Sequence, residues 1–235
     1  MGLPLDSDEA ADFGAARSRV LAVVAEACGR AGRDPSDVTL VAVSKTVDVP
    51  RLTAAMRAGM TLFGENRVQE ADSKASLLPG ATWHLIGPLQ SNKARRAVEL
   101  FDVIESVDSV DLARRLDRLA GELGRAPLGV YLQVNVDRDE AKAGFMPGTL
   151  EADLDELAAL PNLRLRGLMT VGRIAVWPEQ ARPTFVRLRE LAARLRARSG
   201  NVGPGLSMGM SEDYAVAVEE GATVIRVGRA IFGAR

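Results

Sequence analysis

The sequence predicts an α/β fold, a single (β/α)8 or TIM barrel with an extra N-terminal helix, over residues 1–235. Three observations favour this fold. The chain has 235 residues, of which 47% are hydrophobic, and a formal net charge of −1, as expected for a folded chain with one large core. Short β-branched runs alternate with amphipathic helical stretches, and eight such units fit the size of a TIM barrel. Several runs are continuously apolar, as strands buried on both faces of a parallel sheet are.

The elements follow in order from the N-terminus. Apolar residues at helical spacing from Phe13 to Ala27 predict the extra helix, which we expect Gly29 and Gly32 to end. The eight predicted strands are Val38–Val43, Met60–Phe63, Thr82–Ile86, Asp102–Glu105, Gly129–Asn135, Leu165–Met169, Gly205–Ser207 and Thr223–Val227. Helices are predicted near 50–58, 66–77, 92–99, 109–123, 149–159, 178–198 and 211–219. A doubly wound open sheet is the alternative, but no GxGxxG or P-loop phosphate fingerprint follows a strand.

Charge and composition exclude several classes of protein. Thirty basic and 31 acidic residues leave no basic excess of the kind that nucleic-acid binding requires. No apolar run reaches the roughly 18 residues of a membrane span, and the N-terminus lacks the apolar segment of a secretory signal, so we expect a cytoplasmic protein. Cys28 is the only cysteine and His84 the only histidine, which excludes a disulfide and a His-pair metal site. We expect no metal, and a monomer or weak dimer.

The C-terminal ends of the strands carry the side chains that a buried strand would avoid. In a TIM barrel these ends form one face, where binding and catalytic residues lie. All eight predicted ends have polar or soft side chains. In chain order these residues are Lys45, Glu65 with Asn66, His84, Ser106, Asn135, Met169 with Thr170, Ser207, and Arg226 with Gly228. We therefore expect the functional site at this end of the barrel.

Lys45 directly follows the first predicted strand. A neutral lysine amine is the nucleophile that condenses with an aldehyde or ketone to form a Schiff base. The alternative is that Lys45 caps the barrel and extends its amine into water. His84 also has two interpretations, because a lone strand histidine is more often a hydrogen-bonded core residue than a catalyst. The acidic residues Asp137, Asp139 and Glu140 are interpreted as solvated side chains.

A phosphate site is predicted where the loops after strands seven and eight meet. TIM barrels frequently bind phosphate at this place. Gly228 has no Cβ, so the backbone N–H groups of Gly228 and Arg229 can approach an anion closely, and Ser207 would add a hydroxyl. The alternative is that Gly228 and Gly233 are turn glycines. A Schiff-base lysine and a phosphate site on one barrel face is what pyridoxal 5′-phosphate (PLP) requires.

The chain resembles the pyridoxal phosphate homeostasis protein family, which is similar to the barrel domain of alanine racemase. The segments that carry the resemblance are Val41–Thr46, Phe63–Asn66, Val68–Glu70, Trp83–Lys93, Gln133–Asn135, Lys142–Gly144, Arg166–Met169, Ser207–Ser211 and Arg226–Gly233. The resemblance implies that Lys45 carries PLP as an internal aldimine and that Arg226 faces the pyridine nitrogen. It also implies that the phosphate is held by Ser207, Gly228 and Arg229, and that the ring is flanked by Asn66, His84 and Met169. Arg67 departs from the family, which commonly has tyrosine there, and the loop after Met169 is less typical.

The chemistry of Arg226 favours a carrier over an enzyme. An acidic partner would keep the pyridine nitrogen protonated and make the ring a strong electron sink, whereas an arginine is always charged and cannot accept that proton. A racemase needs an acid/base group on each face of the cofactor, and the sequence ends at Arg235, before the further domain that supplies one in the racemase. We expect a non-catalytic PLP-binding protein with PLP-dependent apoenzymes as partners. A low-activity racemase using Lys45 and His84, or a class I aldolase-type lyase, is the alternative.

Overall fold

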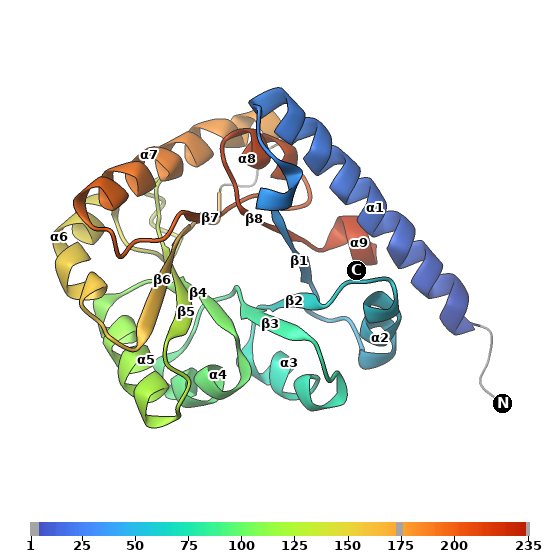
Figure 1. The fold of residues 1–235 in the computed structure, drawn as a ribbon, viewed down its shortest axis with the longest axis horizontal. Coiled ribbons are helices and arrows are strands. Elements are labelled where there is room, and N and C mark those ends of the chain that lie inside the picture. The colour runs from blue at the N-terminus through green and yellow to red at the C-terminus, as the bar shows by residue number, and fades with distance from the viewer. Residues whose placement is uncertain (1–4, 173–175, 234–235) are drawn as a thin grey trace.

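The computed structural model describes residues 5–172 and 176–233 and confirms the predicted barrel. Eight parallel strands close into a ring in chain order, with β1 paired to both β2 and β8 (Figure 1). The strands are β1 Thr39–Val43, β2 Leu62–Glu65, β3 Thr82–Leu85, β4 Val103–Val107, β5 Leu128–Gln133, β6 Leu163–Met169, β7 Gly205–Ser207 and β8 Val224–Val227. Because all strands run in one direction, their C-terminal ends lie on one face of the barrel.

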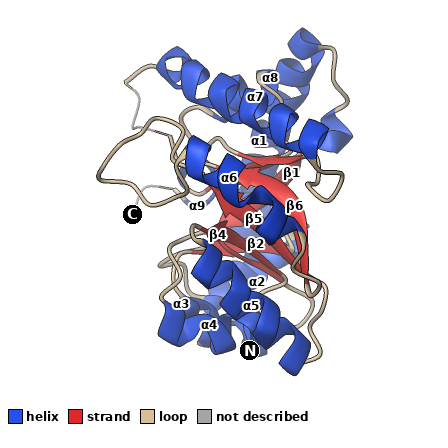
Figure 2. Ribbon diagram, turned by 90° about the vertical axis from the view of Figure 1, so that its left-hand side faces the viewer, coloured by secondary structure: helices blue, strands red, loops and turns tan. Residues whose placement is uncertain are grey.

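Helices surround the strands, and α1 lies outside this ring against α2, α8 and α9 (Figures 1 and 2). The helices are α1 Leu5–Ala31, α2 Val49–Arg57, α3 Val68–Asp72, α4 Ala94–Leu100, α5 Val110–Glu122, α6 Pro147–Ala158, α7 Arg182–Arg198, α8 Tyr214–Glu219 and α9 Arg229–Phe232. Short 3₁₀ turns occur at Pro35–Asp37, Ala75–Leu77, Ser91–Lys93 and Pro178–Ala181. No helix in the described part of the chain is both long and apolar enough to cross a lipid bilayer.

The observed elements differ from the predicted ones at several boundaries. Gly29 does not end the N-terminal helix, because Ala27 and Cys28 beside it are fully buried and this packing outweighs the cost of about 1 kcal/mol for a helical glycine. Gly32, with φ at +65°, is where the helix stops. The helix predicted over 66–77 is α3 followed by a separate 3₁₀ turn, and α9 was not predicted because it has only four residues.

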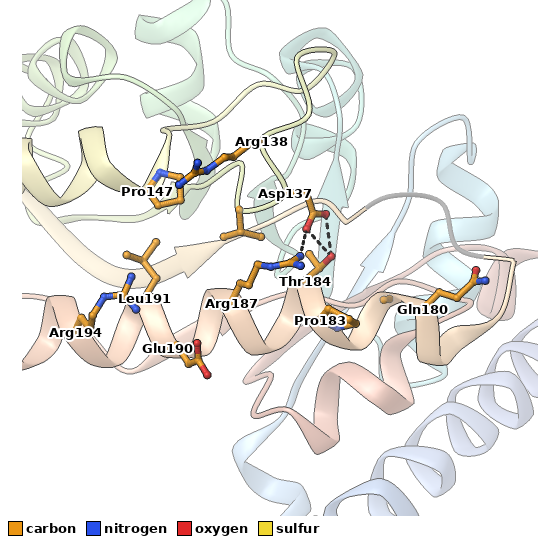
Figure 3. A pocket seen from close by; sticks show the side chains of 12 residues that line it. Asp137, Arg138, Pro147, Gln180, Pro183, Thr184, Arg187, Glu190, Leu191 and Arg194 are labelled. Atoms are coloured by element: carbon orange, nitrogen blue, oxygen red, sulfur yellow. Dashed lines mark hydrogen bonds and ion pairs between the residues drawn. The ribbon is translucent and has the colours of Figure 1, made fainter.

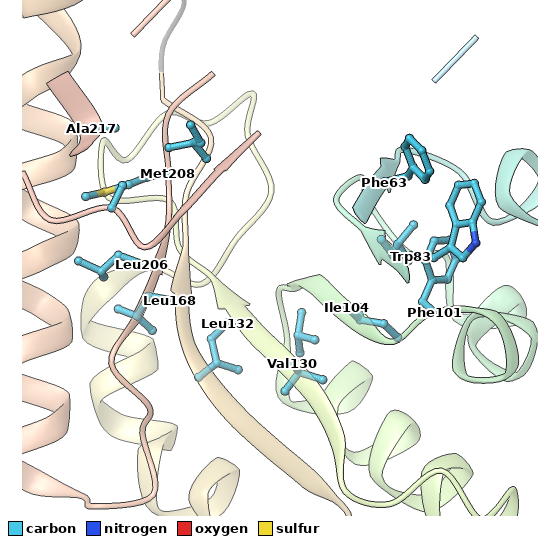
Figure 4. Close-up of a cluster of buried hydrophobic side chains, with 14 of the residues drawn as sticks. Phe63, Trp83, Phe101, Ile104, Val130, Leu132, Leu168, Leu206, Met208 and Ala217 are labelled. Atoms are coloured by element: carbon cyan, nitrogen blue, oxygen red, sulfur yellow. The ribbon is translucent and has the colours of Figure 1, made fainter. Parts of the chain in front are cut away.

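The hydrophobic core has two layers. The outer layer lies between the strands and the helices and includes Phe63 and Trp83, whose ring centroids are 5.5 Å apart (Figure 4). The inner layer fills the barrel with a smaller cluster that consists of Val41, Val103, Tyr131, Met169 and Val224. Cys28 belongs to the outer layer, as a small buried residue should.

Polar side chains occupy the barrel interior next to the inner apolar cluster. Residues two positions apart on a strand face the same side, so Glu105 follows Val103 and Arg226 follows Val224 toward the C-terminal end. Both polar side chains are less than 5% exposed. The barrel interior therefore changes from apolar to charged just below the face on which the site was predicted.

Candidate functional site

A cavity of about 560 Å³ opens on the C-terminal face of the barrel. Five of the eight residues predicted for the site line this cavity, namely Lys45, Asn66, Arg226, Gly228 and Arg229. The aliphatic side chains of Val43, Ile86 and Val171 also line it. The cavity thus combines apolar walls with a small set of polar groups, as small-molecule sites do.

A larger cavity of about 760 Å³ lies outside the barrel, between α7 and the connection from β5 to α6 (Figure 3). The Asp137 carboxylate is engaged at this cavity: Asp137 Oδ1 is 2.8 Å from Arg187 Nη1, and both carboxylate oxygens lie within 2.9 Å of Thr184 Oγ1. The prediction that Asp137 is solvated was therefore wrong, and its side chain is 8% exposed. No predicted site residue lines this cavity, so we place the candidate site in the smaller one.

Lys45 is presented by a short turn that follows β1. Ser44 continues the barrel pairing by donating its N–H to Gly64 O at 3.0 Å, and Val47 N donates back to Ser44 O at 3.0 Å. Thr46 lies between them with φ at +64°, a left-handed conformation that is strained for a β-branched residue. The turn holds Lys45 half-buried at the cavity wall.

A buried ionic cluster supports this turn from below. Lys74 Nζ donates to Ser44 O at 3.0 Å and to Glu65 Oε1 at 2.7 Å. The same carboxylate oxygen accepts a hydrogen bond from Ser44 Oγ at 2.8 Å. Within the described residues, Glu65 Oε2 and Glu70 Oε2 are buried without another partner. Burial and the neighbouring Glu70 carboxyl raise the pKa of Glu65 to about 7, although Lys74 and Ser44 oppose the shift.

Arg226 lies at the base of the cavity and is 4% exposed. Its guanidinium donates from Nη1 to Ser207 Oγ at 2.5 Å and from Nη2 to Thr170 O at 2.8 Å. Glu105 Oε2 lies 3.8 Å from Nη1 and provides the opposite charge. These contacts fix the guanidinium in one orientation inside the barrel.

Glu105 is the acceptor at the centre of this interior network. It is fully buried, and its two oxygens accept hydrogen bonds from His84 Nδ1 at 2.6 Å and Ser207 Oγ at 2.5 Å. Burial raises the pKa of the Glu105 carboxyl, but His84, Arg226 and Ser207 together outweigh burial and hold that pKa below its usual value. Glu105 is therefore an ionised carboxylate that balances the charge of Arg226.

The opposite wall of the cavity comes from the loops after β7 and β8. Gly228 N–H donates to Ser211 Oγ at 3.3 Å, which brings the two loops together. Asp213 shapes the first loop by accepting a hydrogen bond from Met210 N at 2.6 Å. Arg229 extends its side chain into solvent, where Nη2 is 3.0 Å from Glu212 Oε1. Ser211, Gly228 and Arg229 thus line one side of the cavity.

Three residues predicted for the site lie behind the cavity wall. Ser207 is fully buried and its hydroxyl is engaged by Glu105 and Arg226. His84 is 5% exposed with its Nδ1 on Glu105, and Met169 belongs to the inner apolar cluster. None of the three lines the cavity.

Two residues that organise the site, Ser211 and Glu105, were not predicted from the sequence. Ser211 lines the cavity, but it was interpreted only as the start of a helix, and α8 begins three residues later at Tyr214. Glu105 was placed at the end of a strand, although β4 continues to Val107. A signal for Glu105 existed, because a lone carboxylate inside the run Val103–Val107 must have a buried partner. No group of three or more His, Cys, Asp or Glu side chains in the described chain is arranged to hold a metal ion.

Comparisons with known proteins identify the family of this chain. The family model "Alanine racemase, N-terminal domain" matches residues 24–235. The pyridoxal phosphate homeostasis protein of Pseudomonas aeruginosa is 44% identical over 221 residues, which are 93% of this chain and 94% of the relative. The protein of the same name from Escherichia coli K12 is 41% identical over 229 residues, covering 90% of this chain and 92% of the relative.

Solved structures extend the comparison. PipY of Synechococcus elongatus PCC7942 with PLP bound is 46% identical with a TM-score of 0.80, covering 89% of this chain and all of that chain. The structure of PipY without PLP gives 47% identity and a TM-score of 0.81 over the same shares. Alanine racemase of Clostridium difficile, at 14% identity and a TM-score of 0.68 over 92% of this chain, shares the fold. The chain therefore belongs to the alanine racemase N-terminal domain family and, within it, to the pyridoxal phosphate homeostasis proteins.

Proposed function

We propose that the chain binds PLP in the cavity on the C-terminal face, as a Schiff base on Lys45, and holds it without catalysing a reaction. The observation that carries this proposal is that Lys45 and the Ser211–Gly228 hydrogen bond line one cavity. Its volume of about 560 Å³ lies in the range of small-molecule sites, roughly 300–1,000 Å³. Bound PLP would supply an aldehyde for the lysine amine and a phosphate for the donors on the opposite wall. The names of the relatives and the PLP-bound PipY structure support this assignment.

The phosphate donors that we propose are Ser211, Gly228 and Arg229. Gly228 has no Cβ to obstruct an anion, and the Arg229 guanidinium adds positive charge at the same wall. Ser211 takes the role predicted for Ser207, because the Ser207 hydroxyl is engaged inside the barrel by Glu105 and Arg226. Ser207 then serves to hold the Arg226 guanidinium in place.

The interior network supports a holding role over a catalytic one. Arg226 is fixed by Thr170 and Ser207 at the base of the cavity, where we propose that it faces the ring nitrogen beside Asn66. A guanidinium at this place stays charged and does not keep the pyridine nitrogen protonated, so the ring would be a weak electron sink for chemistry at an amino-acid Cα. His84 is turned to Glu105 behind the cavity wall and does not provide the second acid/base group of a racemase. Met169 belongs to the inner apolar cluster and does not line the cavity.

The carrier function also requires that the ligand can leave. Lys45 is only half-buried and Arg229 is exposed. The cavity is therefore accessible from solvent on the side of the loops that follow β7 and β8. We propose PLP-dependent apoenzymes as recipients, consistent with the names of the relatives.

Absorbance and reduction test the covalent attachment. Purified protein with PLP should be yellow, lose its colour with borohydride, and yield a reduced adduct on Lys45 by mass spectrometry. Lys45→Ala should lose the adduct and the colour but retain weak phosphate-dependent binding. A reduced adduct on another lysine would overturn the assignment, and a colourless protein that reacts with phosphorylated sugars would favour the aldolase-type alternative.

A matched pair of serine variants tests the phosphate wall. Ser211→Ala should weaken PLP binding by about tenfold, since a hydrogen bond to a charged group is worth about 1.5–3 kcal/mol. Ser207→Ala should change affinity less, because its hydroxyl does not reach the cavity. The reverse order would restore Ser207 as the phosphate ligand.

Incubation with D- and L-amino acids in deuterated water tests whether the protein holds PLP without catalysis. Steady exchange of the Cα hydrogen for deuterium that requires Lys45 would establish racemase chemistry.

A further inference from the structure

A third cavity lies at the opposite end of the barrel from the candidate site, among the N-terminal ends of the strands. Its volume is about 570 Å³, close to that of the C-terminal cavity. It is lined by the first residue of β1, by the first half of β6 and by the starts of β7 and β8. Three arginines face it: Arg33 from the α1–β1 connection, and Arg164 and Arg166 from β6.

These arginines form no ion pair within the residues that the structure describes. Arg164 and Arg166 are exposed, as is Arg114, but Arg114 bonds to a carboxylate. Arg33 is held by backbone oxygens only, with Nη1 2.6 Å from Val218 O. The single acidic residue that lines the cavity is Asp37, which is exposed. The cavity therefore has a net positive charge of about two among its lining residues.

Tyr131 provides an unpartnered donor at the inner end of this cavity. The residue is 5% exposed and lines the cavity, and its hydroxyl has no hydrogen-bond partner in the described part of the chain. The hydroxyl lies against Gly205, where an added Cβ would be 2.8 Å from Tyr131 Oη. Burial and the Glu105 carboxylate raise the pKa of Tyr131 to about 12, so the phenol keeps its proton and can donate it.

Strand β5, which pairs with β6, leaves room for the Arg166 side chain. Gly129 pairs with Arg164 across β5 and β6, and a Cβ at Gly129 would lie 2.4 Å from Arg166 Nε. The Arg166 side chain therefore lies across β5 in a space that only glycine leaves open. Leu165, Pro204 and Val224 add apolar surface beside these donors.

We propose that this N-terminal cavity binds a small phosphomonoester with an apolar body, whose phosphate is held by Arg164, Arg166 and the Tyr131 hydroxyl. Two planar guanidinium groups and a phenol match the charge and the several acceptor oxygens of a phosphate dianion. The apolar lining would contact the remainder of the molecule. This proposal is independent of PLP binding at the other end of the barrel.

Calorimetric titration with phenyl phosphate tests the site at low ionic strength. The test variant replaces both β6 arginines, Arg164→Gln together with Arg166→Gln. The control is Arg114→Gln, which removes a surface arginine that is paired with a carboxylate. We expect the double variant to bind at least about tenfold more weakly and Tyr131→Phe to bind several-fold more weakly. Arg114→Gln should bind like the wild type, and added salt should weaken binding in all of these proteins.

A second pair of variants separates the two ends of the barrel. Because phenyl phosphate can also enter the C-terminal cavity, the titration is repeated with Ser211→Ala and Arg229→Gln combined. Retention of a binding site in this protein, and its loss when Arg164→Gln and Arg166→Gln are added to it, would support the N-terminal site. Binding that persists in that fourfold variant, or no binding to the wild type, would overturn it. Neither result bears on whether Lys45 forms an adduct with PLP.

Discussion

Two glutamates at the C-terminal end of the barrel, Glu65 and Glu105, are both fully buried but have opposite electrostatic environments. The pKa of Glu65 is raised to about 7, whereas that of Glu105 is lowered. Glu65 shares its surroundings with a second carboxyl, Glu70, and has one cation, Lys74. Glu105 accepts hydrogen bonds on both oxygens and has Arg226 nearby.

The comparison shows that burial alone does not set the charge of a carboxyl group. Desolvation raises both pKa values, and the number and sign of the partners decide the net direction. The network around Glu105 is charge-balanced and fixes Arg226. The cluster around Glu65 has two carboxyls for one ammonium group and can bind a proton near neutral pH.

The largest expected difference between the two glutamates is the loss of unfolding free energy when each carboxylate is replaced by a neutral amide. Glu105→Gln removes the ion-pair partner of the buried Arg226 guanidinium, which typically costs about 3–5 kcal/mol. Glu65→Gln should cost about 1 kcal/mol near pH 7, because Glu65 is partly protonated there and Lys74 keeps its hydrogen bond to Ser44 O. Urea unfolding followed by circular dichroism measures both values. Equal losses in the two variants would contradict the difference between the two environments.

The pH dependence of stability should have opposite signs for the two groups. The folded chain holds the Glu65 proton more tightly than the unfolded chain, so this contribution is present below about pH 4.5 and is lost as the pH rises to about 7. The contribution of Glu105 is present above about pH 4.5 and is lost as the pH falls through its lower folded pKa.

Urea titrations between pH 4.5 and 8 test the Glu65 contribution. The difference in unfolding free energy between the wild type and Glu65→Gln should change by up to about 3 kcal/mol, since one pKa unit corresponds to about 1.4 kcal/mol. Glu156→Gln is the control, because Glu156 is an exposed partner of Arg114. A pH-independent difference for Glu65→Gln would show that Glu65 is ionised throughout this range.

The smallest expected difference concerns the two serines that bond to these glutamates. Ser207→Ala removes a hydroxyl that joins Glu105 to Arg226, so we expect a loss of about 2 kcal/mol. Ser44→Ala removes one bond to Glu65, which Lys74 also contacts, and should cost about 1 kcal/mol. Unfolding in urea ranks the two variants, and a larger loss for Ser44→Ala would reverse the assignment of the stronger network.

The barrel was predictable because its elements are encoded locally. Eight apolar runs alternate with amphipathic segments, and this rhythm determines both the strand number and the face that carries the polar ends. Lys45 and Arg226 were found in this way, because a charged residue that ends a buried run is conspicuous. The boundaries of α1 and α3 were less predictable, because packing against other elements decides where those helices stop.

The pairing inside the site was not predictable from the sequence. Ser207 and Ser211 are four residues apart, and only the three-dimensional arrangement shows that the first contacts Glu105 while the second lines the cavity. The partner of Ser207 is 102 residues distant in the chain, so no local pattern reports the contact. The sequence also could not predict that Arg164 and Arg166 are unpaired, because the folded surroundings decide whether an arginine has a counter-ion.

Gly129 offers a way to separate the charge of a side chain from its location. A methyl group added there would collide with Arg166 and displace its guanidinium, while the total charge of the protein stays the same. Gly129→Ala would therefore move the Arg166 guanidinium by steric exclusion, without the loss of positive charge that accompanies substitution of an arginine. Any property that depends on where this cation lies should respond to that methyl group, and any property that depends only on the overall charge should not.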